Sequence, residues 1–119
     1  MRHLLIALTI LIPTQVLSES HRPVYIEKAA KAFHVDPDLL LALCSVESKC
    51  RTHTINHDDG TRAQKEAGVV SKSYGMFQIK MGTARALGFK GTKNQLLDPN
   101  TNTWFAAKLL HDLNHQYHD

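Results

Sequence analysis

The sequence predicts a small, mainly α-helical domain, and three observations point to it. The 119 residues are 43% hydrophobic and 21% charged, with a formal net charge of +3, which is an ordinary globular composition. Apolar residues recur at helical spacing in several segments, and no segment shows the alternation of a half-buried strand. Aspartate precedes proline at 36–37 and again at 98–99, a pair typical of helix starts.

Residues 1–18 have the pattern of a secretory signal peptide. Arg2 supplies the positive start, residues 4–12 form a short apolar run, and Ser18 ends a small-residue cleavage site. This run has about half of the roughly 20 apolar residues that a spanning helix needs. We therefore expect cleavage after Ser18, a mature domain over residues 19–119, and a periplasmic or secreted protein. An uncleaved anchor or a buried helix is the alternative.

Two helices are predicted at the start of the mature domain. The first opens at Pro23, and its apolar face comprises Ile26, Ala29, Ala30 and Phe33. The second runs from Pro37 to about Lys49, with Asp36 as its N-cap. Because this second helix is mostly apolar, we expect it to be buried nearly all round.

Residues 50–73 are polar and irregular, and they predict a long loop after the second helix. Asp58 and Asp59 precede Gly60, so we interpret them as turn formers. The alternative is that one of them faces the end of the helix and supplies a second acid. A short apolar string follows at residues 74–79.

Two further helices close the chain. A short one is expected at about residues 83–87, ending at Gly88. The last begins at Asp98 and Pro99, and its inner face comprises Asn102, Phe105, Ala106, Leu109, Leu113 and Tyr117.

Three histidines on the last helix raise the question of a metal site. His111, His115 and His118 recur on one helix face, a spacing at which imidazoles can share a cation. The spacing lacks the carboxylate of an H-E-x-x-H motif. We therefore expect a solvated helix end, with no metal and no other cofactor.

Glu47 is the candidate catalytic residue. Leu40, Leu43 and Cys44 precede it by seven, four and three residues, which places it on the apolar face of the second helix. Loss of hydration there would favour the protonated carboxyl that a general acid requires. The alternative is that Glu47 is the first exposed residue at the helix end, paired with Lys49 or Arg51.

Cys44 and Cys50 set a geometric condition on the same helix end. Six residues of unbroken helix separate two α-carbons by about 9 Å along the axis. A disulfide needs α-carbons roughly 4.4–6.8 Å apart. A bridge therefore requires the helix to end just after Glu47 and the chain to turn back. We hypothesise that this bridge forms, since an exported protein can keep a disulfide.

Three blocks, taken in order, resemble motifs of the lytic transglycosylases of the goose-lysozyme-like superfamily. Residues 42–48 resemble the glutamate–serine motif of that family. Residues 73–79 are similar to its Gly-Leu-Met-Gln-Ile motif, with Phe77 at the usual methionine. Residues 102–110 resemble an asparagine-led motif that opens a later helix. The resemblance implies a small lysozyme-like helical domain with a long loop after the catalytic helix.

The resemblance also implies an activity and a set of site residues. The activity is cleavage of the bond between N-acetylmuramic acid and N-acetylglucosamine in peptidoglycan. The product carries a 1,6-anhydro ring, and Glu47 acts first as acid and then as base. The implied substrate-binding residues are Ser73, Gly75, Met76, Phe77, Gln78 and Asn102. Of Met76 and Phe77, one would line the groove and the other would pack inward, while Asn102 would be structural or lie near the glutamate.

The match departs from the family in two places. Ala106 and Leu109 stand where the third motif has glycine and tyrosine, and the chain ends at Asp119 before an Ala-Tyr-Asn motif. A short, catalytically impaired peptidoglycan-binding domain is therefore the alternative to an enzyme.

Expected partners follow from the same reasoning. We expect a monomer that binds peptidoglycan strands, with a cell-envelope or secretion apparatus as a further class of partner. Nucleic acid is not expected, because no basic stripe with interleaved aromatic residues occurs.

Overall fold

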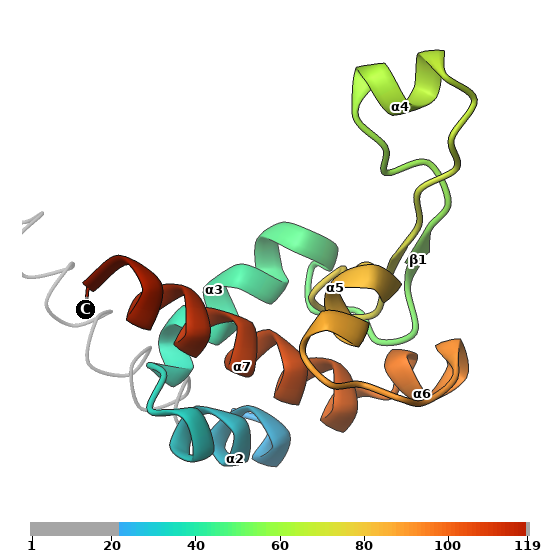
Figure 1. Ribbon diagram of the computed structural model, residues 1–119. Coiled ribbons are helices and arrows are strands. Elements are labelled where there is room, and N and C mark those ends of the chain that lie inside the picture. Colours follow the sequence, from blue (N-terminus) through green and yellow to red (C-terminus); the bar gives the residue numbers. More distant parts are fainter. Residues whose placement is uncertain (1–21, 119) are drawn as a thin grey trace, which may run out of the picture.

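The computed structural model describes residues 22–118, and the predicted signal peptide lies outside this range. Helices and one two-stranded sheet make up the described part, which confirms the mainly α prediction (Figure 1). In chain order the elements are α2 (Val24–Phe33), α3 (Pro37–Ser48), β1 (Ile55–Asn56), α4 (Arg62–Glu66), β2 (Ser73–Tyr74), α5 (Met81–Ala86), α6 (Lys93–Leu97) and α7 (Pro99–His118). No helix among these residues combines the length and the apolar character needed to cross a membrane.

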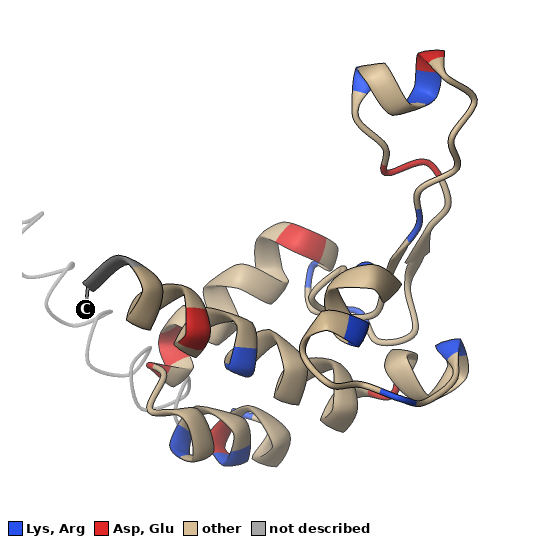
Figure 2. Ribbon diagram, viewed as in Figure 1, with Lys and Arg blue, Asp and Glu red and all other residues tan. Residues whose placement is uncertain are grey.

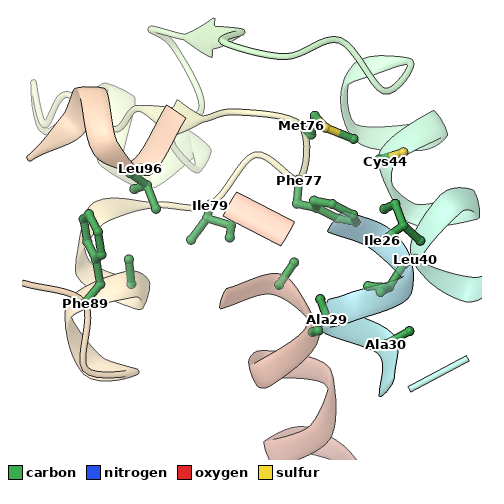
Figure 3. Close-up of a cluster of buried hydrophobic side chains, with 13 residues drawn as sticks. Ile26, Ala29, Ala30, Leu40, Cys44, Met76, Phe77, Ile79, Phe89 and Leu96 are labelled. Carbon is green, nitrogen blue, oxygen red and sulfur yellow. The ribbon is translucent and has the colours of Figure 1, made fainter. Parts of the chain in front are cut away.

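Helix α7 is the centre of the helical body, and α2, α3 and α6 pack against it (Figure 1). Alanines on both partners, Ala29 and Ala30 on α2 and Ala106 and Ala107 on α7, are buried. Such small side chains allow two helices to approach closely. Larger buried side chains from α2, α3 and the segment after β2 fill one part of the core, among them Ile26, Leu40, Met76, Phe77 and Ile79 (Figure 3). Phe89 after α5 and Leu96 on α6 fill the other part.

Helix α3 begins as predicted but is buried on only one side. The Asp36 carboxylate accepts the Asp38 N–H at 2.9 Å, and Pro37 occupies the first helical position. Val46 is 82% exposed and Leu39 is 45% exposed, so the expectation of burial nearly all round is wrong. The physical reason is that α2, α7 and the segment after β2 cover one face of α3, while its other apolar residues face outward.

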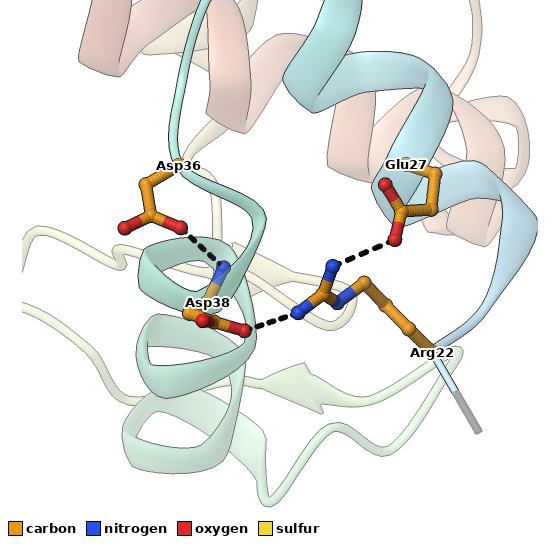
Figure 4. A network of polar contacts seen from close by, with 4 residues as sticks. All are labelled: Arg22, Glu27, Asp36 and Asp38. Atoms are coloured by element: carbon orange, nitrogen blue, oxygen red, sulfur yellow. Dashed lines mark hydrogen bonds and ion pairs between the residues drawn. The ribbon is translucent and has the colours of Figure 1, made fainter. Parts of the chain in front are cut away.

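Arg22 joins the starts of α2 and α3 (Figure 4). Its guanidinium donates to Glu27 Oε1 at 2.7 Å and to a carboxylate oxygen of Asp38. The hydrogen bond to Glu27, together with the two negative charges, raises the pKa of Arg22 above its ordinary value. The pair of contacts holds the first turn of α3 beside α2.

The segment predicted as one long loop contains regular structure. We call residues 55–74, from β1 to β2, the arm, because they extend away from the helical body (Figure 1). The two strands pair antiparallel, with Ile55 opposite Tyr74 and Asn56 opposite Ser73, and α4 lies between them in the chain. Two-residue strands are too short to show the alternation that predicts a strand.

Helices α4 and α6 were not predicted, although the sequence carries a signal for both. Each begins with a capping box, in which a threonine hydroxyl accepts the N–H of a glutamine three residues on and the glutamine side chain returns the bond. The pairs are Thr61 with Gln64, and Thr92 with Gln95. Five residues each is too short for an apolar period, so the capping box is the signal that sequence reasoning had available.

Candidate active site

Helix α3 ends just after Glu47, as a disulfide between Cys44 and Cys50 requires. The helix closes at Ser48, and Lys49 and Cys50 adopt left-handed backbone angles, with φ of 58° and 55°. The Cys50 N–H donates to the Cys44 carbonyl at 2.9 Å, and the two cysteines are disulfide-bonded with α-carbons 4.6 Å apart. The bridge therefore fixes the turn that directly follows Glu47.

Ser48 joins this helix end to the segment after β2. Its side chain is buried, and its hydroxyl donates to the Met76 carbonyl at 2.7 Å. Leu40, Cys44 and Ser48 form one buried stripe at intervals of four residues. Sequence reasoning missed Ser48, although this spacing was available as a signal.

Glu47 is exposed, so its predicted place on the buried face is wrong. The buried stripe advances by four residues at each step and reaches Ser48, which rotates Glu47 out toward solvent. Neither Lys49 nor Arg51 forms an ion pair with Glu47 in the described part of the chain, and Arg51 Nε donates instead to the Ser48 carbonyl at 3.0 Å. Glu47 therefore presents a carboxyl group from a helix end that is itself well fixed.

Residues 74–79 form a tight hairpin, which we call the motif hairpin. Tyr74 and Ile79 exchange two backbone hydrogen bonds of 3.0 Å, and the Gln78 N–H donates to the Gly75 carbonyl at 3.1 Å. Gly75 has a φ of +78°, a region that glycine adopts without strain. The hairpin brings Met76 to α3 and Phe77 to α7.

Asn102 on α7 holds the motif hairpin from the other side. It is fully buried, and its side chain makes three hydrogen bonds. Oδ1 accepts the Phe77 N–H at 2.8 Å, and Nδ2 donates to the carbonyls of Tyr74 and Leu96, each at 2.9 Å. A β-carbon added at Gly75 would lie 2.5 Å from Asn102 Cγ, so the glycine is needed for this close approach.

Ser73 is fully buried and donates its hydroxyl to the Asp59 carboxylate. The Asp59 carbonyl in turn accepts Lys80 Nζ at 3.0 Å, and Asp58 pairs with Lys65 at 3.4 Å. Both aspartates are thus engaged in contacts within the arm and at its base. In these contacts Asp59 serves as a structural partner of Ser73.

Five of the six predicted substrate-binding residues are buried in the fold, and their contact with a sugar stays a prediction. They are Ser73, Gly75, Met76, Phe77 and Asn102. Met76 and Phe77 both pack inward, with 1% and 7% exposure, which corrects the expectation that one of them lines the groove (Figure 3). The physical reason is that a tight turn pinned between α3 and α7 has little surface left for a ligand.

Gln78 is the exception among the predicted binding residues. It is half-buried, and its Nε2 donates to the carbonyls of Thr54 and Gly75, at 3.2 Å and 2.9 Å. No described residue donates to its Oε1. Gln78 therefore offers one fixed acceptor at the surface of the motif hairpin.

The histidines of α7 make contacts within the fold. His111 Nδ1 lies 3.1 Å from the Phe33 carbonyl, and its ring meets that of His115 edge to face at 4.4 Å. The side chain of His118 lies outside the described residues. Among the described residues, no three metal-ligating side chains are grouped so that they could hold an ion.

The helical body and the motif hairpin both lie in the part of the chain that one known family matches. A family model described as transglycosylase SLT domain matches residues 24–119. A comparison with curated proteins finds no match. The matched range begins with α2 and includes the last turn of α3, the motif hairpin and Asn102.

Proposed function

The chain belongs to the transglycosylase SLT domain family, and from this premise we propose that it cleaves the N-acetylmuramic acid–N-acetylglucosamine bond of peptidoglycan. One observation carries the assignment of Glu47 as the acid. It is exposed on the last turn of α3, and the adjacent Ser48 binds the Met76 carbonyl of the motif hairpin at 2.7 Å. A general acid must reach the glycosidic oxygen from a fixed position.

The proposed reaction uses one carboxyl group twice. The Glu47 carboxyl gives its proton to the glycosidic oxygen as the bond from that oxygen to C1 of the muramic acid breaks. The C6 hydroxyl oxygen of the same sugar then bonds to C1 and closes the 1,6-anhydro ring. Its proton passes to the Glu47 carboxylate, which restores the acid. Ordinary glycosidases need a second carboxyl group to act as nucleophile or to activate water.

Because Glu47 is exposed, the proposal requires the bound substrate to shield its carboxyl group from water. A bound glycan strand would cover the carboxyl group, remove water from it and favour its protonated form. The same covering would keep water from attacking C1 before the C6 hydroxyl does. Gln78 Oε1 would accept a hydrogen bond from a sugar hydroxyl or an acetamido N–H, since Nε2 is already bonded within the fold.

We place the protein outside the cytoplasm. The Cys44–Cys50 disulfide supports this placement, because such bonds persist in oxidising compartments. The signal peptide over residues 1–18, the cleavage site and a cell-envelope or secretion apparatus as partner remain predictions.

The direct test is digestion of purified peptidoglycan with the exported protein, followed by mass spectrometry of the products. We expect anhydro-muropeptides from the wild type and none from Glu47→Gln. Glu66→Gln is the matched control, because Glu66 is also exposed but lies on α4 in the arm. Products with ordinary reducing ends would indicate hydrolysis by water instead.

A binding protein that does not cleave is the second candidate. It is favoured by Ala106 and Leu109, which stand where the third motif of the resembled family has glycine and tyrosine. This candidate predicts that the wild type and Glu47→Gln sediment equally with peptidoglycan and that neither releases product. Release of anhydro-muropeptides by the wild type alone excludes it.

A further inference from the structure

A groove of about 420 Å³ lies between the end of the arm and the start of α5, and the motifs do not account for it. Val70, Lys72, Tyr74, Lys80, Gly82 and Thr83 line it. We propose that this groove binds the peptide stem of peptidoglycan through the carboxylates of that stem. The inference rests on the proposed function, since it names a further part of the same substrate.

Charge is the first argument. The groove is lined by two lysines and by no aspartate or glutamate among the described residues. Lys72 is exposed and forms no ion pair with the described residues. Lys80 donates to the Asp59 backbone carbonyl at 3.0 Å, while the Asp59 carboxylate accepts the Ser73 hydroxyl. Neither ammonium group has a carboxylate partner within the described part of the chain, and an anionic ligand could supply one.

The uncharged residues that line the groove suit a short peptide. Val70 is 73% exposed on the arm, and Tyr74 contributes a half-buried ring. Peptide stems of peptidoglycan combine free carboxylates with alanine methyl groups, so both kinds of surface have a counterpart. Gly82 keeps space open, because a β-carbon added there would meet no heavy atom within 4 Å.

Position relative to Glu47 is the third argument. Tyr74 and Lys80 stand at the two ends of the motif hairpin, one as its first residue and one directly after its last. Ser48 ties the same hairpin to the last turn of α3. Lys72 is the basic residue of the limb that leads from α4 back toward α5, and Figure 2 shows one basic segment on this limb. The peptide stem is attached to the muramic acid at the bond to be cleaved, so a peptide site on this hairpin is suitably placed.

The test compares binding to two polymers by co-sedimentation: peptidoglycan with its peptide stems, and glycan strands from which an amidase has removed them. A Glu47→Gln background prevents cleavage from consuming either polymer. We expect tighter binding to the peptide-bearing polymer, and we expect Lys72→Gln to weaken it roughly tenfold without changing binding to bare strands. Lys72→Arg should retain the preference, and Lys93→Gln, which changes an exposed lysine on α6, is the matched control.

A second variant tests the proposal by placing a large side chain in the groove. Gly82→Leu places a side chain in the open space and should weaken peptide-dependent binding while leaving the free energy of unfolding unchanged or higher. An unchanged preference for peptide-bearing polymer in both Lys72→Gln and Gly82→Leu would overturn the proposal, and so would equal binding of the parent protein to both polymers.

The groove proposal is tested by binding and the cleavage proposal by release of anhydro product, so each can fail without the other. If the Glu47→Gln protein prefers the peptide-bearing polymer and the wild type releases no anhydro product, the cleavage proposal is refuted and the groove proposal stands. If the wild type releases product and the Glu47→Gln protein shows no preference, the groove proposal alone is refuted.

Discussion

The motif hairpin and the last turn of α3 are in contact, yet they use their polar groups in opposite ways. In the hairpin and its support, Gly75, Phe77 and Asn102 direct their hydrogen bonds into the protein. At the end of α3, Glu47 faces solvent and makes no described contact with another side chain. The contrast teaches that most motif residues make contacts within the fold, while the carboxyl group proposed as the acid faces solvent.

The largest expected effect comes from Gly75→Ala. The new β-carbon would meet Asn102 Cγ at 2.5 Å, and the backbone would keep a φ of +78° that alanine resists. Strain and overpacking together should lower the free energy of unfolding by about 4 kcal/mol, as measured by urea denaturation. A loss within experimental error of zero would show that the hairpin is not clamped as described.

Asn102→Ala should cost about 3 kcal/mol, because it leaves the buried Phe77 N–H without an acceptor and removes two further hydrogen bonds. The double variant Gly75→Ala/Asn102→Ala provides a sharper measurement. Removing the Asn102 amide also removes the atoms that the β-carbon added at position 75 would strike, so the double variant should cost less than the sum of the two. Simple additivity would mean that these two residues do not interact.

Loss of the Cys44–Cys50 bridge should have a smaller effect on stability. Replacing both cysteines with alanine should lower the free energy of unfolding by about 2 kcal/mol, since the bridge closes only a short loop. Because Glu47 lies inside that loop, we also expect slower release of anhydro-muropeptides at a temperature where the variant is fully folded. Unchanged release would show that Ser48 alone is sufficient to position the helix end.

Gln78→Ala should have the smallest effect. If Gln78 Oε1 accepts a hydrogen bond from the sugar as proposed, its removal costs about 1 kcal/mol, which corresponds to a loss of cleavage rate of a fewfold to about tenfold. Circular dichroism before and after the substitution checks that the hairpin remains folded. A full rate with an intact fold would remove Gln78 from the substrate site.

Much of the helical body could be predicted from the sequence, because periodicity and caps are local signals. Asp36 with Pro37 and Asp98 with Pro99 mark the starts of α3 and α7 correctly. The orientation of Glu47 was predicted wrongly, since three- and four-residue spacings both fit a helix face. The spacing of Leu40, Cys44 and Ser48 was a signal for the buried face, and tertiary packing decides between the two. The burial of Met76 and Phe77 likewise depends on α3 and α7, which are distant from them in the chain.

The most direct measurement is the amount of anhydro-muropeptide that wild type and Glu47→Gln release from purified peptidoglycan, combined with the free energy of unfolding of both proteins. Because Glu47 is exposed and unpaired among the described residues, the substitution should leave stability within about 0.5 kcal/mol of the wild type. We predict complete loss of product at unchanged stability. Equal product from both proteins would contradict the assignment of Glu47 as the catalytic acid.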